Sequence, residues 1–107
     1  MNHQDQTKLI PVSKIFQSYK KNKVLVKRTP MLKSNYLSEK YEANIYIKRE
    51  DLQDIRSFKI RGAGTAFSYL TEEEKARGVC TASAGNHAQG IAYCCNKFKI
   101  KGTIFMP

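Results

Sequence analysis

Residues 79–106 read VCTASAGNHAQGIAYCCNKFKIKGTIFM. This run begins with Val79 to Ala82, whose short apolar character favours a buried strand. A loop containing Gly85 follows, and a second strand is expected from Gly102 to Met106. The helix expected between the strands has an inner face made of Ala88, Ile91, Ala92 and Cys95. Because a strand, a helix and another strand form the unit of a parallel sheet, the chain is predicted to have an α/β fold with parallel sheets flanked by helices.

A first helix is predicted near the start of the chain, because apolar residues recur with helical spacing at Val12, Ile15, Phe16 and Tyr19. This helix should end near Asn22. The Thr29-Pro30 pair then marks an extended or turn segment, since proline disfavours helical geometry in the residue before it. The sequence thus predicts a break in helical structure before residue 30.

A second, short helix is expected from Ser34 to about Tyr41, with Leu37 and Tyr41 on its inner face. The next segment, residues 44–48, is rich in β-branched and aromatic side chains and is predicted to be a strand. The polar residues 49–51 should end that strand.

A further helix is expected to open at Ser57, a residue type that caps helix starts well, which places Lys59 in the first turn. Thr71 and Glu74 have the spacing of a capping box, in which each side chain bonds the other residue's backbone. A short helix is therefore predicted after Thr71, ending at Gly78.

The chain is strongly basic, with 19 lysines and arginines against 9 acidic residues in 107 and a net charge of +10. Such a charge could attract nucleic acid. The basic residues are scattered and match no recognised nucleic-acid-binding motif, so nucleic acid is not expected as a partner. A basic nucleic-acid-binding module nevertheless remains an alternative from a different functional class.

Three cysteines, Cys80, Cys94 and Cys95, are present without any Cys-x-x-Cys pair. Neither a disulfide framework nor a metal site is expected, and all three are predicted to fill core positions as free thiols. The polar start of the chain does not resemble a secretory signal, and its apolar stretches are too short to cross a bilayer. A cytoplasmic location without membrane contact is therefore expected.

The loop from Ser83 to His87 gathers backbone N–H groups at a helix start, where the helix dipole favours a carboxylate or phosphate. Gly85 lets a ligand approach the backbone closely, and the Asn86 amide can donate or accept a hydrogen bond. An ordinary connection between strand and helix would have the same spacing. Both interpretations remain open on these residues alone.

Known phosphate-binding motifs do not match. Gly85 and Gly90 have the glycine spacing of a Walker A loop, but Ile91 and Ala92 stand where lysine and serine or threonine are required. Residues 62–64 lack the third glycine of the dinucleotide fingerprint and follow no strand directly. ATP binding of the Walker type is therefore excluded.

Lys59 is flanked by Arg56 and Arg61. Cationic neighbours lower the pKa of a lysine and raise the fraction of neutral amine that can attack an aldehyde. A solvated lysine on a basic helix is the alternative.

Three linked motifs identify a family resemblance. They are Lys48-Arg49-Glu50-Asp51-Leu52, Ser57-Phe58-Lys59-Ile60-Arg61-Gly62-Ala63 and Ser83-Ala84-Gly85-Asn86-His87-Ala88-Gln89-Gly90. In this order and spacing they resemble the threonine dehydratase family, of the biosynthetic type, within the pyridoxal-phosphate fold type II (tryptophan synthase beta-like) enzymes. The resemblance runs from about the first helix to Pro107. Ile60 stands where threonine synthase-like chains usually carry aspartate, which favours the dehydratase and serine racemase branch.

The resemblance implies a role for each motif. Lys59 would bind pyridoxal 5'-phosphate covalently and remove the α-proton of the substrate, and Phe58 would pack against the cofactor ring. The loop Ser83, Ala84, Gly85, Asn86 and His87 would receive the substrate carboxylate. Asn86 would also lie near the phenolic oxygen of the cofactor.

The implied reaction is conversion of L-threonine to 2-oxobutanoate and ammonia, the first step of isoleucine biosynthesis, by an enzyme that is usually a homotetramer. Serine dehydratase or serine racemase is the alternative within the family. Residues 1–53 would begin the larger cofactor-binding domain, and residues 54–107 would begin the smaller domain. The family's phosphate-holding glycine loop does not occur in the sequence, so the 107-residue chain alone is expected to be an inactive N-terminal fragment.

Overall fold

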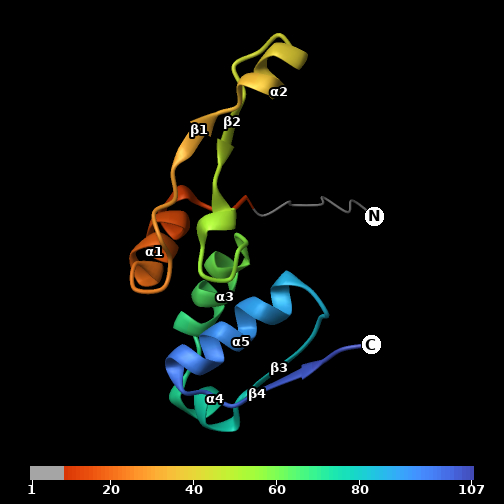
Figure 1. The fold of residues 1–107 in the computed structure, drawn as a ribbon. Helices are drawn as coiled ribbons and strands as arrows, with labels where there is room; N and C mark the ends of the chain where they lie inside the picture. The colour runs from red at the N-terminus through yellow and green to blue at the C-terminus, as the bar shows by residue number, and fades with distance from the viewer. Residues whose placement is uncertain (1–8) are drawn as a thin grey trace, which may run out of the picture.

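The computed structural model describes residues 9–107, and Figure 1 shows their arrangement. The elements in chain order are α1 (Val12–Asn22), β1 (Met31–Lys33), α2 (Asn35–Lys40), β2 (Tyr46–Lys48), the short 3-10 helix η1 (Glu50–Leu52), α3 (Lys59–Ser68), α4 (Glu72–Arg77), β3 (Val79–Ala82), α5 (Asn86–Phe98) and β4 (Gly102–Phe105). Every helix and strand predicted from the sequence is therefore present, with bounds shifted by a few residues at most.

Strands β3 and β4 pair in parallel, with Val79 opposite Gly102 and Ala82 opposite Phe105. Helix α5 connects them and lies against the pair, as the strand-helix-strand pattern predicted (Figure 1). The second sheet differs from the prediction, because β1 and β2 are antiparallel. The sequence predicts an extended or turn segment at Thr29-Pro30 but no strand at residues 31–33, since nothing in so short a segment reveals a partner strand at residues 46–48.

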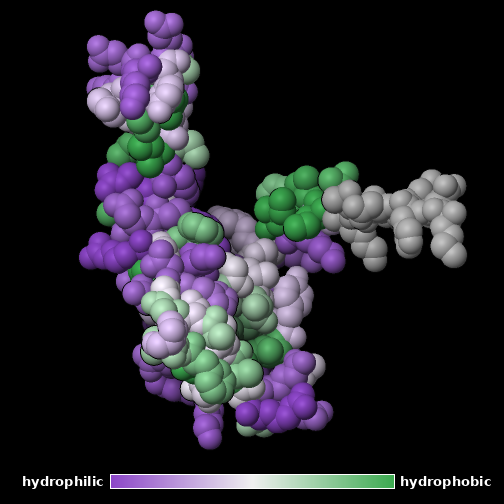
Figure 2. Space-filling model, turned by 90° about the vertical axis from the view of Figure 1, so that its right-hand side faces the viewer, coloured by the Kyte–Doolittle hydropathy of each residue, from purple (hydrophilic) through white to green (hydrophobic). Residues whose placement is uncertain are grey.

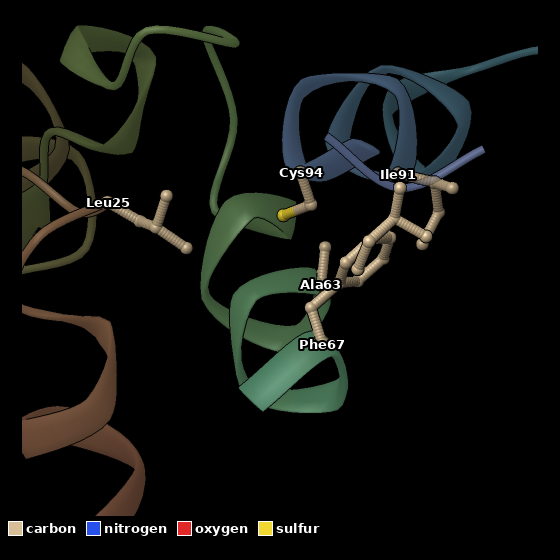
Figure 3. Close-up of a cluster of buried hydrophobic side chains, with 6 residues drawn as sticks. Leu25, Ala63, Phe67, Ile91 and Cys94 are labelled. Carbon is tan, nitrogen blue, oxygen red and sulfur yellow. The ribbon is translucent and has the colours of Figure 1, made fainter. Parts of the chain in front are cut away.

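The core forms where α3 crosses α5. Figure 3 shows Ala63 and Phe67 of α3 facing Ile91 and Cys94 of α5, with Leu25 approaching from the segment after α1. The rings of Phe67 and Phe98 stack with centroids 5.9 Å apart. The crossing is close because Gly90 has no side chain: a Cβ there would lie 3.3 Å from the Cβ of Ala63. Burial of these apolar side chains is the main stabilising contribution in this part of the chain.

Helix α1 packs against α3 through a polar contact. The buried Asn22 side chain donates hydrogen bonds to the Arg61 carbonyl at 3.0 Å and to the Thr65 hydroxyl at 2.7 Å. Opposite Asn22, α3 carries Gly64, where a Cβ would collide with the amide oxygen of Asn22 and lie 2.9 Å from Leu25 Cδ1. A glycine at this position allows the two helices to approach.

The apolar face predicted for α1 exists, but the rest of the described chain does not cover it. Val12, Ile15, Phe16 and Tyr19 are all more than half exposed. Figure 2 shows apolar side chains next to the grey N-terminal residues, where the chain enters α1.

Elements β1, α2 and β2 form an arm that projects from the rest of the molecule (Figure 1). All residues of both arm strands are exposed. The radius of gyration is 17.5 Å, whereas a compact chain of this length would have about 13 Å. In the described part of the chain, residues 9–107, no helix is long and apolar enough to span a membrane.

Several local predictions are confirmed. Thr71 and Glu74 form the capping box at the start of α4, with bonds of 2.8 and 3.2 Å, and Gly78 ends that helix with φ 86°. Ser34 caps α2 through the backbone N–H of Leu37. Tyr41, predicted to face inward from this helix, is instead exposed because the projecting arm offers nothing to cover it.

Three further predictions about burial and capping are wrong. Ser57 does not cap α3, which begins two residues later and has no side-chain cap. On α5 the buried face is rotated, so that Cys94 is buried while Ala92 is exposed. Cys80 on β3 is also exposed and Cys95 is half-buried, so only Cys94 is a full core thiol, and its burial raises its pKa to about 11.

Candidate active site

Lys59 is the first residue of α3 and is half-buried. Its amine lies 5.3 Å from the centre of the Phe58 ring. The amine makes no hydrogen bond or ion pair with another residue in the range 9–107, and the Phe58 ring beside it is 60% exposed. The structure therefore presents an unpaired primary amine beside an open aromatic face.

The Ser83–His87 loop connects the end of β3 to the start of α5. Ser83 extends the parallel ladder, because its N–H donates to the Phe105 carbonyl at 3.0 Å. The Ser83 hydroxyl accepts a hydrogen bond from the Gly85 N–H at 3.2 Å, which closes the loop on itself. His87 is held by a 3.1 Å hydrogen bond between its Nε2 and the Thr81 hydroxyl on β3.

The start of α5 is open to an anion. Gly85 precedes the helix and provides no side-chain cap, and the first-turn N–H groups of any α-helix lack intrahelical partners. A Cβ added to Gly85 would meet nothing within 4 Å, so the backbone is accessible. The loop residues Ala84, Gly85, Asn86 and His87 are all exposed, and Ser83 is half-buried. These groups suit a carboxylate or phosphate oxygen.

The packing of α3 on α5 brings the lysine and the loop to the same side of the molecule. A Cβ at Gly90 would lie 3.4 Å from the carbonyl oxygen of Lys59, so α5 touches the first residue of α3. Asn86 precedes Gly90 by four residues, which is one turn of helix, and shares its face of α5. Asn86 is therefore on the face of α5 that is directed towards the start of α3.

A buried polar cluster lies beside the start of α3. Glu50 accepts hydrogen bonds from the Arg61 guanidinium at 2.7 and 2.8 Å, and from the Thr29 hydroxyl at 2.5 Å. The Gln53 amide donates to Glu50 at 3.3 Å and to the Lys27 carbonyl at 2.8 Å. Mainly through the Arg61 hydrogen bonds, the pKa of Glu50 is lowered to about 2, so this carboxylate is ionised at neutral pH.

Glu50 and Arg61 both lie within the sequence motifs, but the sequence alone predicts no contact between them. Their separation of eleven residues matches neither helical nor strand spacing, and the pair forms only because the chain turns back after η1. Arg61 was expected to act as a free cation beside Lys59. Its charge is instead compensated by Glu50.

The residues fit an aldehyde cofactor that carries anionic groups. Lys59 supplies an unpaired amine, Phe58 an exposed ring, and the start of α5 open N–H donors. Helix α3, like α5, begins without a side-chain cap, so no side chain occupies the N–H groups of its first turn. No group of three or more His, Cys, Asp or Glu able to hold a metal ion occurs within residues 9–107.

Comparison with known proteins gives consistent results. A family model described as pyridoxal-phosphate dependent enzyme matches residues 5–107. The chain is 55% identical over 93 residues, 87% of its length, to a protein named biosynthetic L-threonine dehydratase IlvA from Staphylococcus epidermidis, of which it covers 22%.

Two solved structures resemble the fold. Serine racemase from Dictyostelium discoideum gives a TM-score of 0.85 at 34% identity, over 92% of this chain and 32% of the racemase. Processed threonine deaminase isoform 2 from Solanum lycopersicum gives 0.73 at 38% identity, over 92% of this chain and 28% of the deaminase. The chain thus spans roughly a quarter of the length of these relatives.

Proposed function

The chain belongs to the family of pyridoxal-phosphate dependent enzymes, and from this we propose that it forms the lysine-bearing part of a threonine dehydratase, which converts L-threonine to 2-oxobutanoate and ammonia. The single observation that carries this proposal is the unpaired Lys59 amine on a helix that packs directly against the helix bearing the asparagine loop. Identity of 55% to a biosynthetic threonine dehydratase supports the choice of reaction.

We assign roles to the chain's own residues as follows. Lys59 would bind the cofactor aldehyde through its amine and, once the amino group of threonine has displaced it, the freed amine would take the proton from the α-carbon. Phe58 covers one side of the cofactor ring. Within the loop 83–87, the N–H groups of Ala84, Asn86 and His87, which have no partner among the described residues, bind the substrate carboxylate, with Asn86 on the side towards Lys59. His87 is turned to Thr81, so it contributes its backbone to the loop.

Pyridoxal phosphate, when bound, supplies an electron sink for the negative charge that develops at the α-carbon. The protein's contribution is orientation. Lys59 must stand on the side of the α-carbon that carries the proton, and the loop fixes the carboxylate so that this proton points to the amine. The α-proton and the β-hydroxyl would leave together as one water, and the resulting enamine would tautomerise to an imine, whose C=N bond a second water would hydrolyse to 2-oxobutanoate and ammonia.

The location and assembly of the protein belong to the same proposal. Cys80, Cys94 and Cys95 are free thiols, which suits a reducing compartment, so we propose the cytoplasm. We propose a homotetramer by analogy with the family. The division of the chain at residue 54 into the starts of a larger and a smaller domain also remains a proposal.

The decisive experiment replaces the lysine in the full-length protein. Lys59→Ala should abolish both the covalent cofactor, mapped after borohydride reduction, and threonine turnover. Lys97→Ala, which removes an exposed lysine near the other end of α5, is the matched control and should keep both. A Lys59→Ala protein that still carried the cofactor and released 2-oxobutanoate would refute the assignment.

Substrate preference needs a second measurement, because serine racemases are among the structural relatives. We expect 2-oxobutanoate release from L-threonine to exceed both pyruvate release from L-serine and formation of D-serine. Faster reaction of serine in either assay would assign the chain to the serine branch.

A further inference from the structure

The start of α3, which carries Lys59, lacks the local features that usually fix a helix start. The residue before the helix, Phe58, provides no side-chain cap. Ser57 is buried with its hydroxyl unpaired, and Arg56 has a positive φ of 59°. The orientation of the first turn must therefore be set by contacts from elsewhere in the chain.

Arg61, in this first turn, is held at two points. Its guanidinium donates to both oxygens of Glu50, at 2.7 and 2.8 Å, and its carbonyl accepts from the Asn22 amide at 3.0 Å. A two-bond contact between arginine and a carboxylate fixes direction as well as distance. These contacts restrict both rotation and displacement of the turn.

Glu50 is a rigid anchor for this contact. Its side chain is only 14% exposed, and it also accepts hydrogen bonds from Thr29 and Gln53. Gln53 is 1% exposed and is itself bonded to both the N–H and the carbonyl of Lys27. The carboxylate is thus fixed to the chain segment before the arm, far from α3 in sequence.

The geometry of the helix explains how Arg61 affects Lys59. With about 3.6 residues per turn, side chains two positions apart point to nearly opposite sides of a helix. Glu50 holds the Arg61 side chain on one side of the first turn, so the Lys59 side chain is directed to the opposite side of the helix. The same carboxylate contact therefore fixes the turn without occupying the amine.

We propose that Glu50 is a positioning residue for Lys59, acting through Arg61 to hold the first turn of α3 so that the amine faces the cofactor site. This inference rests on the proposed function. Glu50 touches neither cofactor nor substrate in this role, and its effect is on how readily the lysine amine forms and keeps its bond to the cofactor.

The chain contains a matched control on the same short helix. Asp51, next to Glu50, pairs with Arg49 through two hydrogen bonds of 2.7 and 2.8 Å. That pair is exposed and lies within residues 49–51, and neither of its side chains forms a hydrogen bond or ion pair with α3 among the described residues. Asp51→Asn removes one carboxylate charge, as Glu50→Gln does, and leaves the first turn of α3 untouched.

The test uses the full-length protein and pyridoxal phosphate as the probe. We expect Glu50→Gln to weaken cofactor affinity and slow covalent attachment at Lys59 by about tenfold, the factor for one lost charge-assisted hydrogen bond. Attachment is measured by borohydride reduction and peptide mapping, well below the unfolding midpoint of each variant. Amide hydrogen exchange of residues 59–62 should become faster in the same variant, and Asp51→Asn should match the parent in every assay.

A milder variant keeps the proposal testable if Glu50→Gln does not fold. Glu50→Asp keeps the charge but shortens its reach, and should give an intermediate loss of attachment with weaker circular dichroism of the bound cofactor. If either Glu50 variant folds and reacts at Lys59 with parent affinity and rate, Glu50 has only a structural role and the proposal is wrong. If the parent protein itself fails to react at Lys59, the proposed function fails instead.

Discussion

Single residues decide how closely the helices of this chain approach each other. Gly64 and Gly62 lie two positions apart on α3 but face different surroundings. Gly64 faces Asn22 and Leu25, whereas nothing lies within 4 Å of a Cβ at Gly62. The same chemical change at these two positions should therefore have opposite effects.

We expect Gly64→Ala to lower the free energy of unfolding by about 2 kcal/mol, because the added methyl group must displace the buried Asn22 amide. Gly62→Ala should raise it by up to about 1 kcal/mol, since alanine loses less backbone entropy in a helix. Urea unfolding of the two variants side by side checks the prediction. Equal destabilisation by both would show that α1 does not pack on α3 as described.

Glu50 predicts how stability depends on pH. Its pKa is about 2 in the folded chain, below the ordinary value of 4.5. Because the folded pKa is the lower one, the stabilisation is complete above pH 4.5 and is lost as pH falls through about 2. Glu50→Gln should lower the free energy of unfolding by about 2 kcal/mol at pH 7. This is less than the full pKa shift of Glu50 implies, because the side chain of its partner Arg61 is 39% exposed and water screens the interaction.

The measurement compares the free energy of unfolding of the parent with that of Glu50→Gln from pH 7 to pH 2. The difference between the two free energies should become steadily smaller below pH 4.5. A difference that stayed constant to pH 2 would mean that the carboxylate does not titrate with the expected pKa.

At the scale of whole elements, the helices differ in how their ends are fixed. Helix α4 has only six residues and depends on its capping box, in which Thr71 and Glu74 exchange hydrogen bonds. Helices α3 and α5 lack side-chain caps and are held by packing against each other. Local sequence therefore controls α4, while tertiary contacts control the two helices of the candidate site.

Thr71→Ala should lower the free energy of unfolding by about 1 kcal/mol, the usual effect of losing a side-chain cap. Glu73→Gln, which changes an exposed residue in the same turn without touching the cap, should change it by less than about 0.5 kcal/mol. Thermal unfolding of both variants provides the measurement. An effect of Glu73→Gln as large as that of Thr71→Ala would point to charge in the first turn as the dominant factor.

This difference explains which elements sequence reasoning could predict. Capping boxes, glycine ends and apolar periodicity are local, so α1, α4, α5 and the parallel β3–β4 pair were predicted with nearly correct bounds. The β1–β2 pairing and the Glu50–Arg61 contact join residues distant in sequence, and no local pattern reports them. Burial on α5 was misjudged because Cys94 and Ala92 are both small and apolar, and only the crossing with α3 decides which one faces inward.

In the candidate site, too, local sequence patterns could be predicted, whereas contacts between distant residues could not. The residue types Lys59, Gly85 and Asn86 were visible in the motifs, but their juxtaposition depends on the close approach at Gly90. The roles given to these residues remain predictions until the lysine is mapped.

Considered as a whole, the molecule combines one well-packed region with broad exposed apolar surfaces. Helices α3 and α5 with the parallel strands surround the core, whereas α1 and the arm expose large side chains to water. Ile15 and Phe16 of α1 are about as exposed as Met31 of the arm. Exposed apolar surface of this extent favours association.

The 107-residue chain should therefore bind a hydrophobic dye while folded, and should self-associate as its concentration rises. The double variant Ile15→Ser and Phe16→Ser should reduce both effects without lowering the unfolding midpoint by more than a few degrees, because neither side chain is in the core. Dye fluorescence and analytical ultracentrifugation make the measurement. Unchanged dye binding in this variant would assign the effect to the arm.

The chain segments before and after the arm contact each other directly, and these contacts do not involve the arm. Ahead of the arm, Asn22 and Lys27 bond to Arg61 and Gln53, which follow it, and Leu25 enters their common core. A protease that cut the exposed peptide at Glu42, at the far end of the arm, would thus leave the two halves associated. Nicked material should elute as one species from a sizing column and separate into two peptides only in denaturant.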